Sequence, residues 1–108
     1  MTNNDMVPEL TNGEFENFIK EGTVLIDFFA EWCMPCVMMG PIIEELAEEF
    51  NEKIKFGKVN VEDNHEIAQK FGVSSIPTFI LFQGGQIKEQ IMGAIDKDDL
   101  GNVIKSYI

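Results

Sequence analysis

The chain has no arginine, one histidine, one tryptophan and only two cysteines, and its eight cationic side chains are all lysines. Arginine is the residue best suited to phosphate groups and base edges, so nucleic-acid binding is not expected. We ascribe the net charge of −11 to solubility. No apolar run approaches the roughly 20 residues that span a bilayer, and the polar residues 1–5 contain no signal-peptide pattern. Membrane contact is therefore not expected.

The 108 residues are enough for one domain with a real hydrophobic core, and we expect residues 1–108 to form that single domain. A hydrophobic content of 44 % and nine phenylalanines exclude a disordered chain. Without a signal segment the default compartment is a reducing cytosol, where a lone cysteine pair is more often catalytic than structural. We therefore expect a cytoplasmic protein.

The two cysteines, Cys33 and Cys36, form a Cys-x-x-Cys motif between a strand-like apolar run at 24–30 and a helix-like segment. Such a pair at a strand–helix junction can cycle between dithiol and disulfide. Unpaired N–H groups and the positive dipole end of the first helical turn favour a thiolate, the species that attacks disulfides. We expect Cys33, nearer these N–H groups and solvent, to be the attacking thiolate, and Cys36 to be shielded one turn further in.

Three other interpretations compete with redox chemistry at this pair. A structural zinc site needs about four ligands, and the chain offers one cysteine pair and His65, which its helical pattern places in solvent. A structural disulfide here would close a very short loop and constrain the unfolded chain little. Inert core thiols are ordinary, but Trp32 and Pro35 beside them indicate an exposed turn. Redox chemistry is the preferred interpretation.

The hydrophobic periodicity along the chain predicts alternating helices and strands. Asp96 is a predicted helix cap, and Gly84-Gly85 is a two-residue hairpin signal. The order of elements predicts a mixed sheet that helices cover on both faces. The elements are a short strand before Thr11, a helix from Thr11 that Gly22 ends, a strand at 23–30, a helix from Met34 to about Asn51 bent at Pro41, a strand at 54–61, a helix that Asp63 or Asn64 caps and Gly72 ends, strands at 78–83 and 86–92, and a last helix.

Asp27 lies inside the apolar strand at 23–30, where an isolated carboxylate is costly and its pKa should rise. One interpretation is a strand acid bridged by water. In the functional interpretation, a neutralisable acid beneath the sulfurs relays protons to and from Cys36. Trp32, next to a solvent-facing cysteine, fits a docking surface better than a core position.

The run from Asp27 to Cys36, with Pro41, Lys58, Ile76-Pro77-Thr78 and Gly93-Ala94 following in order, resembles the thioredoxin family from end to end. The resemblance implies an α/β thioredoxin fold, a single five-stranded mixed sheet flanked by four helices, acting as a protein-disulfide reductase. It implies that Cys33 attacks, that Cys36 resolves the mixed disulfide, and that Lys58 is the partner of Asp27.

The resemblance further implies a cis Ile76–Pro77 bond facing the disulfide and no cofactor beyond the Cys33–Cys36 disulfide. A thioredoxin reductase-type electron donor and disulfide-containing target proteins would be its partners, and the protein would act as a monomer. The implied target-docking residues are Trp32, Met34, Pro35, Ile76, Pro77 and Gly93.

Three positions depart from the commonest family pattern, with Phe29, Met34 and Val37 in place of tryptophan, glycine and lysine. These departures bear on redox potential and choice of partner. Two other functions remain open: an oxidase or isomerase of the same fold, which needs an oxidising compartment, and a binding module that keeps the fold without turnover. Reduction of an insulin-type disulfide with a dithiol donor separates the binding module from the reductase.

Overall fold

The computed structural model describes residues 6–108, and residues 1–5, whose polar composition lacks a signal-peptide pattern, lie outside the described residues. The elements of the described part are α1 (Asn12–Ile19), β1 (Thr23–Phe29), α2 (Met34–Glu49), β2 (Lys55–Asn60), α3 (His65–Lys70), β3 (Thr78–Gln83), β4 (Gln86–Met92) and α4 (Lys97–Lys105). The four strands form one mixed sheet in the order β2-β1-β3-β4, with β2 parallel to β1 and both β3 and β4 in antiparallel pairs.

Within residues 6–108 the sheet has one strand fewer than the five that the sequence predicts, because the segment before Thr11 meets β2 at a single bridge between Glu9 and Lys58. The Leu10 N–H donates to the Lys58 carbonyl at 2.8 Å, and the Lys58 N–H donates to the Pro8 carbonyl at 3.0 Å. The next donor toward the N-terminus would be the N–H of residue 8, which proline lacks. The ladder therefore stops after one step.

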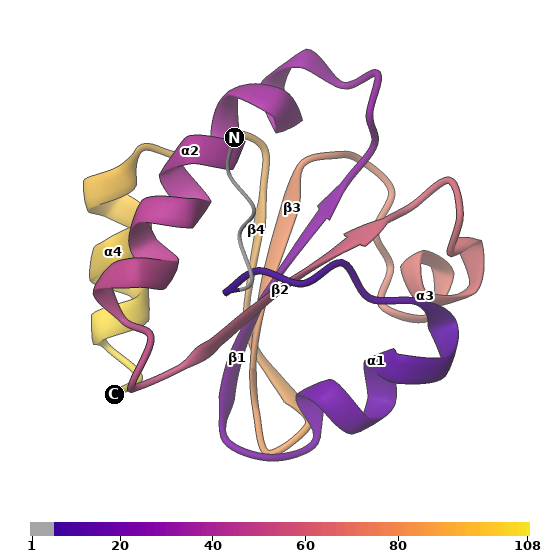
Figure 1. The fold of residues 1–108 in the computed structure, drawn as a ribbon. Helices are drawn as coiled ribbons and strands as arrows, with labels where there is room; N and C mark the ends of the chain where they lie inside the picture. The colour runs from indigo at the N-terminus through magenta and orange to yellow at the C-terminus, as the bar shows by residue number, and fades with distance from the viewer. Residues whose placement is uncertain (1–5) are drawn as a thin grey trace.

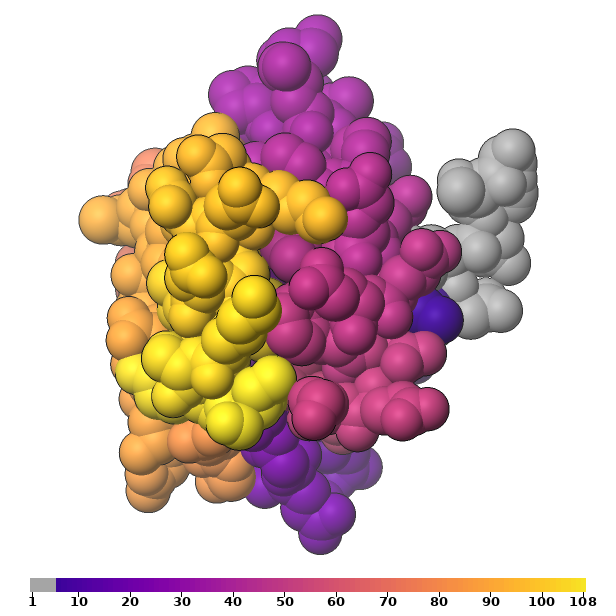
Figure 2. All heavy atoms as spheres, turned by 90° about the vertical axis from the view of Figure 1, so that its left-hand side faces the viewer, coloured from indigo at the N-terminus to yellow at the C-terminus, as the bar shows by residue number. Residues whose placement is uncertain are grey.

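Helices cover both faces of the sheet, as predicted, because the side chains of β1 alternate between two cores. Leu25 packs with α2 and α4 on one face, in a cluster that includes Ile43 and Leu46. Ile26 and Phe28 pack on the other face, in a cluster with α1 and α3. Figure 1 shows α2 and α4 on one side of the sheet with α1 and α3 on the other, and Figure 2 shows α2 and α4 side by side.

Local signals in the sequence account for most of the element ends. Asp96 caps α4 by accepting a first-turn backbone N–H at 2.9 Å. Gly84 and Gly85 both have positive φ, 58° and 83°, as a two-residue hairpin between β3 and β4 requires. Asn64 precedes α3 as expected, but its side chain makes no cap hydrogen bond to the helix; its amide instead donates to the Asn60 carbonyl at 3.0 Å.

The end of β1 and the start of α2 lie close together in the chain, separated by residues 30–33. The segments that follow two parallel strands emerge at the same end of the sheet, the end formed by the carboxyl ends of the strands, and α/β proteins commonly bind ligands there. The cysteine motif therefore lies at the carboxyl end of the central strand. Within residues 6–108, no helix combines the length and the apolar character of a membrane span.

Candidate active site

Cys33 and Cys36 form a disulfide, with their Cα atoms 5.2 Å apart. Cys33 is the residue just before α2 and has an extended backbone (φ −86°, ψ 107°), while Cys36 lies in the first turn. The pair thus bridges the strand–helix junction, as predicted, because two residues of a regular helix at this spacing would hold their Cβ atoms too far apart.

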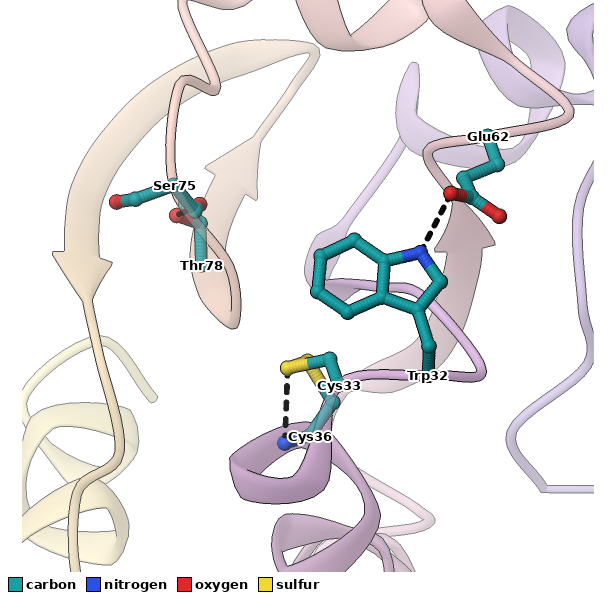
Figure 3. Close-up of a disulfide and its surroundings, with 6 residues drawn as sticks. All are labelled: Trp32, Cys33, Cys36, Glu62, Ser75 and Thr78. Atoms are coloured by element: carbon teal, nitrogen blue, oxygen red, sulfur yellow. Dashed lines mark hydrogen bonds between the residues drawn. A yellow bond between two sulfur atoms is a disulfide. The ribbon is translucent and has the colours of Figure 1, made fainter.

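The Cys36 backbone N–H donates a hydrogen bond to the Cys33 sulfur at 3.2 Å (Figure 3). Once the disulfide is reduced, this N–H and the positive end of the α2 dipole both favour a negative charge on Cys33. Pro35 lies in the same turn and has no N–H to leave unpaired. The first turn of α2 is therefore built to hold a thiolate at Cys33.

Burial does not distinguish the two cysteines, which corrects the expectation that Cys33 lies nearer solvent. Cys33 is 5 % exposed and Cys36 is 6 % exposed. Both pack with Ala30, and Ile76 from a distant part of the chain packs against this small cluster. The hydrogen bond from the Cys36 N–H, and not a difference in burial between the two residues, distinguishes the cysteines.

Trp32 is 68 % exposed, so the only tryptophan of the chain is a surface residue, as expected. Its indole N–H donates to a carboxylate oxygen of Glu62 (Figure 3). Glu62 itself is held by its backbone N–H, which donates to the Asn60 side chain at 2.9 Å. Glu62 orients the indole, a role that the local sequence pattern does not indicate. The parallel pairing of β1 and β2 is the signal that could have indicated this contact. Residues that follow two parallel strands lie at the same end of the sheet, as Trp32 and Glu62 do.

Asp27 is buried, with 6 % of its surface exposed, and its Oδ1 has no hydrogen-bond partner among the described residues. Burial raises the pKa of Asp27 from 3.8 to about 7, and the positive charge of Lys58 opposes that rise. Lys58 lies opposite Asp27 in the register of β2 against β1. Its ammonium lies 5.5 Å from the ring centroid of Phe29, and within residues 6–108 no ion pair joins it to Asp27.

A cavity of about 250 Å³ brings the acid, the lysine and the inner cysteine together. Asp27, Lys58, Cys36 and Val37 are among the residues that line it. A cavity of this size that exposes a carboxyl group and an ammonium group can hold water, which can carry protons between groups that do not touch. The expected neighbourhood of Asp27, Lys58 and Cys36 is therefore present.

The second wall of the site comes from the segment before β3. The Ile76–Pro77 peptide bond is cis, and the Thr78 hydroxyl closes this turn by donating to the Ser75 carbonyl at 2.6 Å (Figure 3). The Gly93 N–H donates to the Pro77 carbonyl at 2.8 Å, and its φ of 94° suits glycine. Trp32, Met34 and Pro35 adjoin the cysteines in the chain, while Ile76 packs against the cysteine cluster and brings Pro77 and its hydrogen-bond partner Gly93 to the same site.

Within the described residues, no group of three or more histidine, cysteine, aspartate and glutamate side chains is placed to hold a metal ion. The group in this site that can exchange electrons is the cysteine pair. The arrangement provides a sulfur nucleophile, a second sulfur within bonding distance, a buried acid that titrates near neutrality and an exposed rim.

Comparisons with known proteins agree with this chemistry. Residues 6–106 match the family model described as Thioredoxin. The chain is 44 % identical to a thioredoxin of Listeria monocytogenes over 103 residues, which are 95 % of this chain and all of that protein. It is 45 % identical to a thioredoxin of Chlamydia caviae over 102 residues, 94 % of this chain and 99 % of that protein. The solved structure of a mutant thioredoxin from Halobacterium salinarum superposes with a TM-score of 0.88 at 34 % identity, covering 99 % of this chain and 96 % of that one.

Proposed function

The chain belongs to the thioredoxin family and is a protein-disulfide reductase acting by dithiol–disulfide exchange, and we propose that Cys33 is its nucleophile and Cys36 its resolving thiol. The observation that carries this assignment is the hydrogen bond from the Cys36 N–H to the Cys33 sulfur. An N–H that points at one sulfur stabilises that sulfur as the thiolate, so it is the one that attacks.

The exchange proceeds in two displacements. The Cys33 thiolate attacks one sulfur of a target disulfide, the target S–S bond breaks, and its other sulfur leaves as a thiolate. Cys36, as a thiolate, then attacks the Cys33 sulfur of the mixed disulfide and releases the second target sulfur. Two electrons pass to the target, whose two thiolates take up protons, and the Cys33–Cys36 disulfide remains.

We assign Asp27 the role of proton relay for Cys36, with Lys58 setting its charge. The second displacement needs Cys36 without its proton, and a base is most effective when its pKa lies near the working pH. Asp27, with a pKa raised to about 7, lines the same cavity as Cys36. The positive charge of Lys58 keeps the carboxyl from becoming a still weaker acid.

The target-docking surface comprises residues on both sides of the disulfide. Gly93 leaves open space, since an added Cβ there would meet nothing of this chain within 4 Å, so an extended target segment can approach closely. Ile76 offers backbone groups beside the cysteines, as in recognition of an extended peptide. The proposed docking residues are Trp32, Met34, Pro35, Ile76, Pro77 and Gly93.

We assign the partners by the direction of the reaction. A reductase must be recharged, so its partners are a thioredoxin reductase-type electron donor and disulfide-containing proteins, and the disulfide itself is its only redox group. Sustained reduction requires a reducing compartment, which favours the cytoplasm. We propose that residues 1–108 form one thioredoxin domain that acts as a monomer, without binding nucleic acid or membrane.

The test uses two serine variants and a disulfide-containing protein such as insulin. Cys36→Ser can attack but not resolve, so it should accumulate a mixed disulfide with the target. Cys33→Ser should accumulate almost none, and the unsubstituted protein should reduce insulin catalytically with a dithiol donor. Equal trapping by the two variants would overturn the assignment of roles, and no insulin reduction by the unsubstituted protein would overturn the function.

A further inference from the structure

Three methionines around the disulfide are unusually exposed for large apolar side chains. Met34 is 64 % exposed, Met38 is 68 % exposed and Met92 is 64 % exposed. Contiguous apolar side chains in solvent call for an explanation, whereas a single one does not. Met39, the neighbour of Met38 in α2, is 2 % exposed and shows where a structural methionine of this helix lies.

Met34 and Met38 are neighbours on the surface of α2, because residues four apart lie on the same face of a helix. Both line an apolar groove of about 510 Å³, and Ala94 and Ile95 form part of its lining. The groove lining starts at Met34 and includes Pro35, the residue before Cys36, so the groove adjoins the reactive pair.

Met92 reaches the neighbourhood of the cysteines from β4. It ends β4, where it pairs with Thr78, the residue after Pro77, and it precedes Gly93. Ile76 of the same segment packs against the cysteine cluster. Exposed methionines from α2 and from the end of β4 therefore belong to segments that meet near the disulfide.

We propose that Met34, Met38 and Met92 form a peroxide-sensitive modification site whose oxidation to sulfoxides weakens the docking of protein targets. In each step a hydroperoxide transfers one oxygen to the thioether sulfur. The O–O bond breaks, an S=O bond forms, the sulfur loses two electrons, and water or an alcohol leaves. The effect on docking rests on the function proposed above, whereas the site of oxidation does not.

The physical reason is a change from apolar to polar at a surface that a target must cover. A sulfoxide oxygen is a strong acceptor, and burying it without a donor is unfavourable. The two cysteines are buried and, as a disulfide, have no thiol for peroxide to oxidise. Sulfoxidation should therefore change docking while leaving the exchange chemistry intact.

The first experiment maps the oxidation. The disulfide form is treated with hydrogen peroxide, and peptide masses follow the gain of one oxygen at each methionine. We expect Met34, Met38 and Met92 to oxidise about tenfold faster than Met39, because sulfoxidation follows exposure. Equal rates at the exposed methionines and Met39 would overturn the site.

The second experiment measures docking. After treatment, dithiothreitol regenerates the dithiol and leaves the sulfoxides, and reduction of insulin is compared with reduction of a small aromatic disulfide. The insulin rate should fall about fivefold, and the small-disulfide rate should stay within about 1.5-fold, because only a protein target covers the rim. Unchanged insulin reduction overturns the proposal, and so does an equal loss with both substrates.

Variants test whether the methionines cause the loss of insulin reduction. For each protein the insulin rate after peroxide is divided by its own rate before peroxide, so that differences in basal rate cancel. The triple change Met34→Leu, Met38→Leu and Met92→Leu should lose the sensitivity, while Met39→Leu, a volume-conserving core change, should keep it. Methionine sulfoxide reductases should restore the treated protein. A triple variant that stays sensitive overturns the proposal. Failure of the untreated protein to reduce insulin would count against the proposed function instead.

Discussion

Replacing Asp27 by asparagine should change how the stability of the protein depends on pH. The carboxyl is buried, and its pKa rises from 3.8 to about 7 because burial disfavours the charged form. Between these two values the unfolded chain has released the proton and the folded protein still holds it. Stability is therefore lost as pH rises through this window, and the loss is complete above about pH 7.

The size of the effect follows from the width of the window. The interval from 3.8 to about 7 is about 3 pH units, and at about 1.4 kcal/mol per unit it corresponds to about 4 kcal/mol. That is a large fraction of the roughly 5 to 15 kcal/mol that stabilises a typical domain. Asp27→Asn cannot ionise, so it lacks this loss and should gain about 4 kcal/mol relative to the unsubstituted protein between about pH 4 and pH 8.5.

Urea unfolding of the disulfide form at several pH values measures this directly. With a slope of about 2 kcal/mol per molar urea, the difference between the two midpoints should change by about 2 M across the window. The buried amide of asparagine adds an offset that does not depend on pH, so only the change with pH carries the argument. Asp63→Asn, at an exposed position, controls for the loss of one negative charge. A difference that stays constant from about pH 4 to pH 8.5 would refute the reasoning.

Three further changes test the fold, the docking surface and the redox site. Gly57→Ala places a Cβ 2.9 Å from the nearest methyl carbon, and this overpacking should cost about 1–3 kcal/mol in urea unfolding. Glu62→Ala releases the indole of Trp32 and should raise KM for insulin about twofold to fivefold with kcat unchanged. Met34→Gly with Val37→Lys places a cation four residues after the attacking thiol, which should raise its thiolate fraction and raise the reduction potential by about 10–20 mV. The dependence of the thiol alkylation rate on pH measures the thiolate fraction, and equilibration with a glutathione buffer measures the reduction potential.

Each of these changes has a matched control in the chain. Gly13→Ala, where an added Cβ meets nothing within 4 Å, should not destabilise the protein. Glu62→Gln keeps an oxygen that can accept the indole hydrogen bond, so its KM should stay near that of the unsubstituted protein. Val37→Gln adds polarity without charge and should leave the potential unchanged. If a control variant gives the same result as its test variant, the contact or charge that we take as the cause of the effect is not its cause.

The parts of the fold that depend on neighbouring residues could be predicted from the sequence. The apolar face of α2, the hairpin at Gly84-Gly85 and the cap at Asp96 are all confirmed, because each follows from spacing or from one local hydrogen bond. The resemblance to the thioredoxin family added the cis bond before Pro77. These features need no knowledge of which distant segments meet.

The features that the sequence analysis missed arise where distant segments meet. The burial of the two cysteines involves Ile76, which packs against their cluster and lies forty residues further along the chain than Cys36. The bond from Trp32 to Glu62 requires the register of two parallel strands. Residues 6–108 do not form the predicted fifth strand, because Pro8 lacks the backbone N–H that would extend the ladder. Hydrophobic periodicity carries no information about such a missing hydrogen-bond donor.

The single bridge between Glu9 and Lys58 also determines how long the amide hydrogens at this edge persist in deuterated water. The Lys58 N–H is bonded to the Pro8 carbonyl, and a local opening of residues 8–10 is enough to break that contact. The Asp27 amide lies in the central strand, paired on both sides, and should exchange only when the sheet itself opens. The lysine and the acid that it faces therefore belong to regions with different opening free energies. The backbone of Lys58 should therefore open to solvent more often than that of Asp27, although the charge of the lysine side chain opposes the rise in the pKa of Asp27.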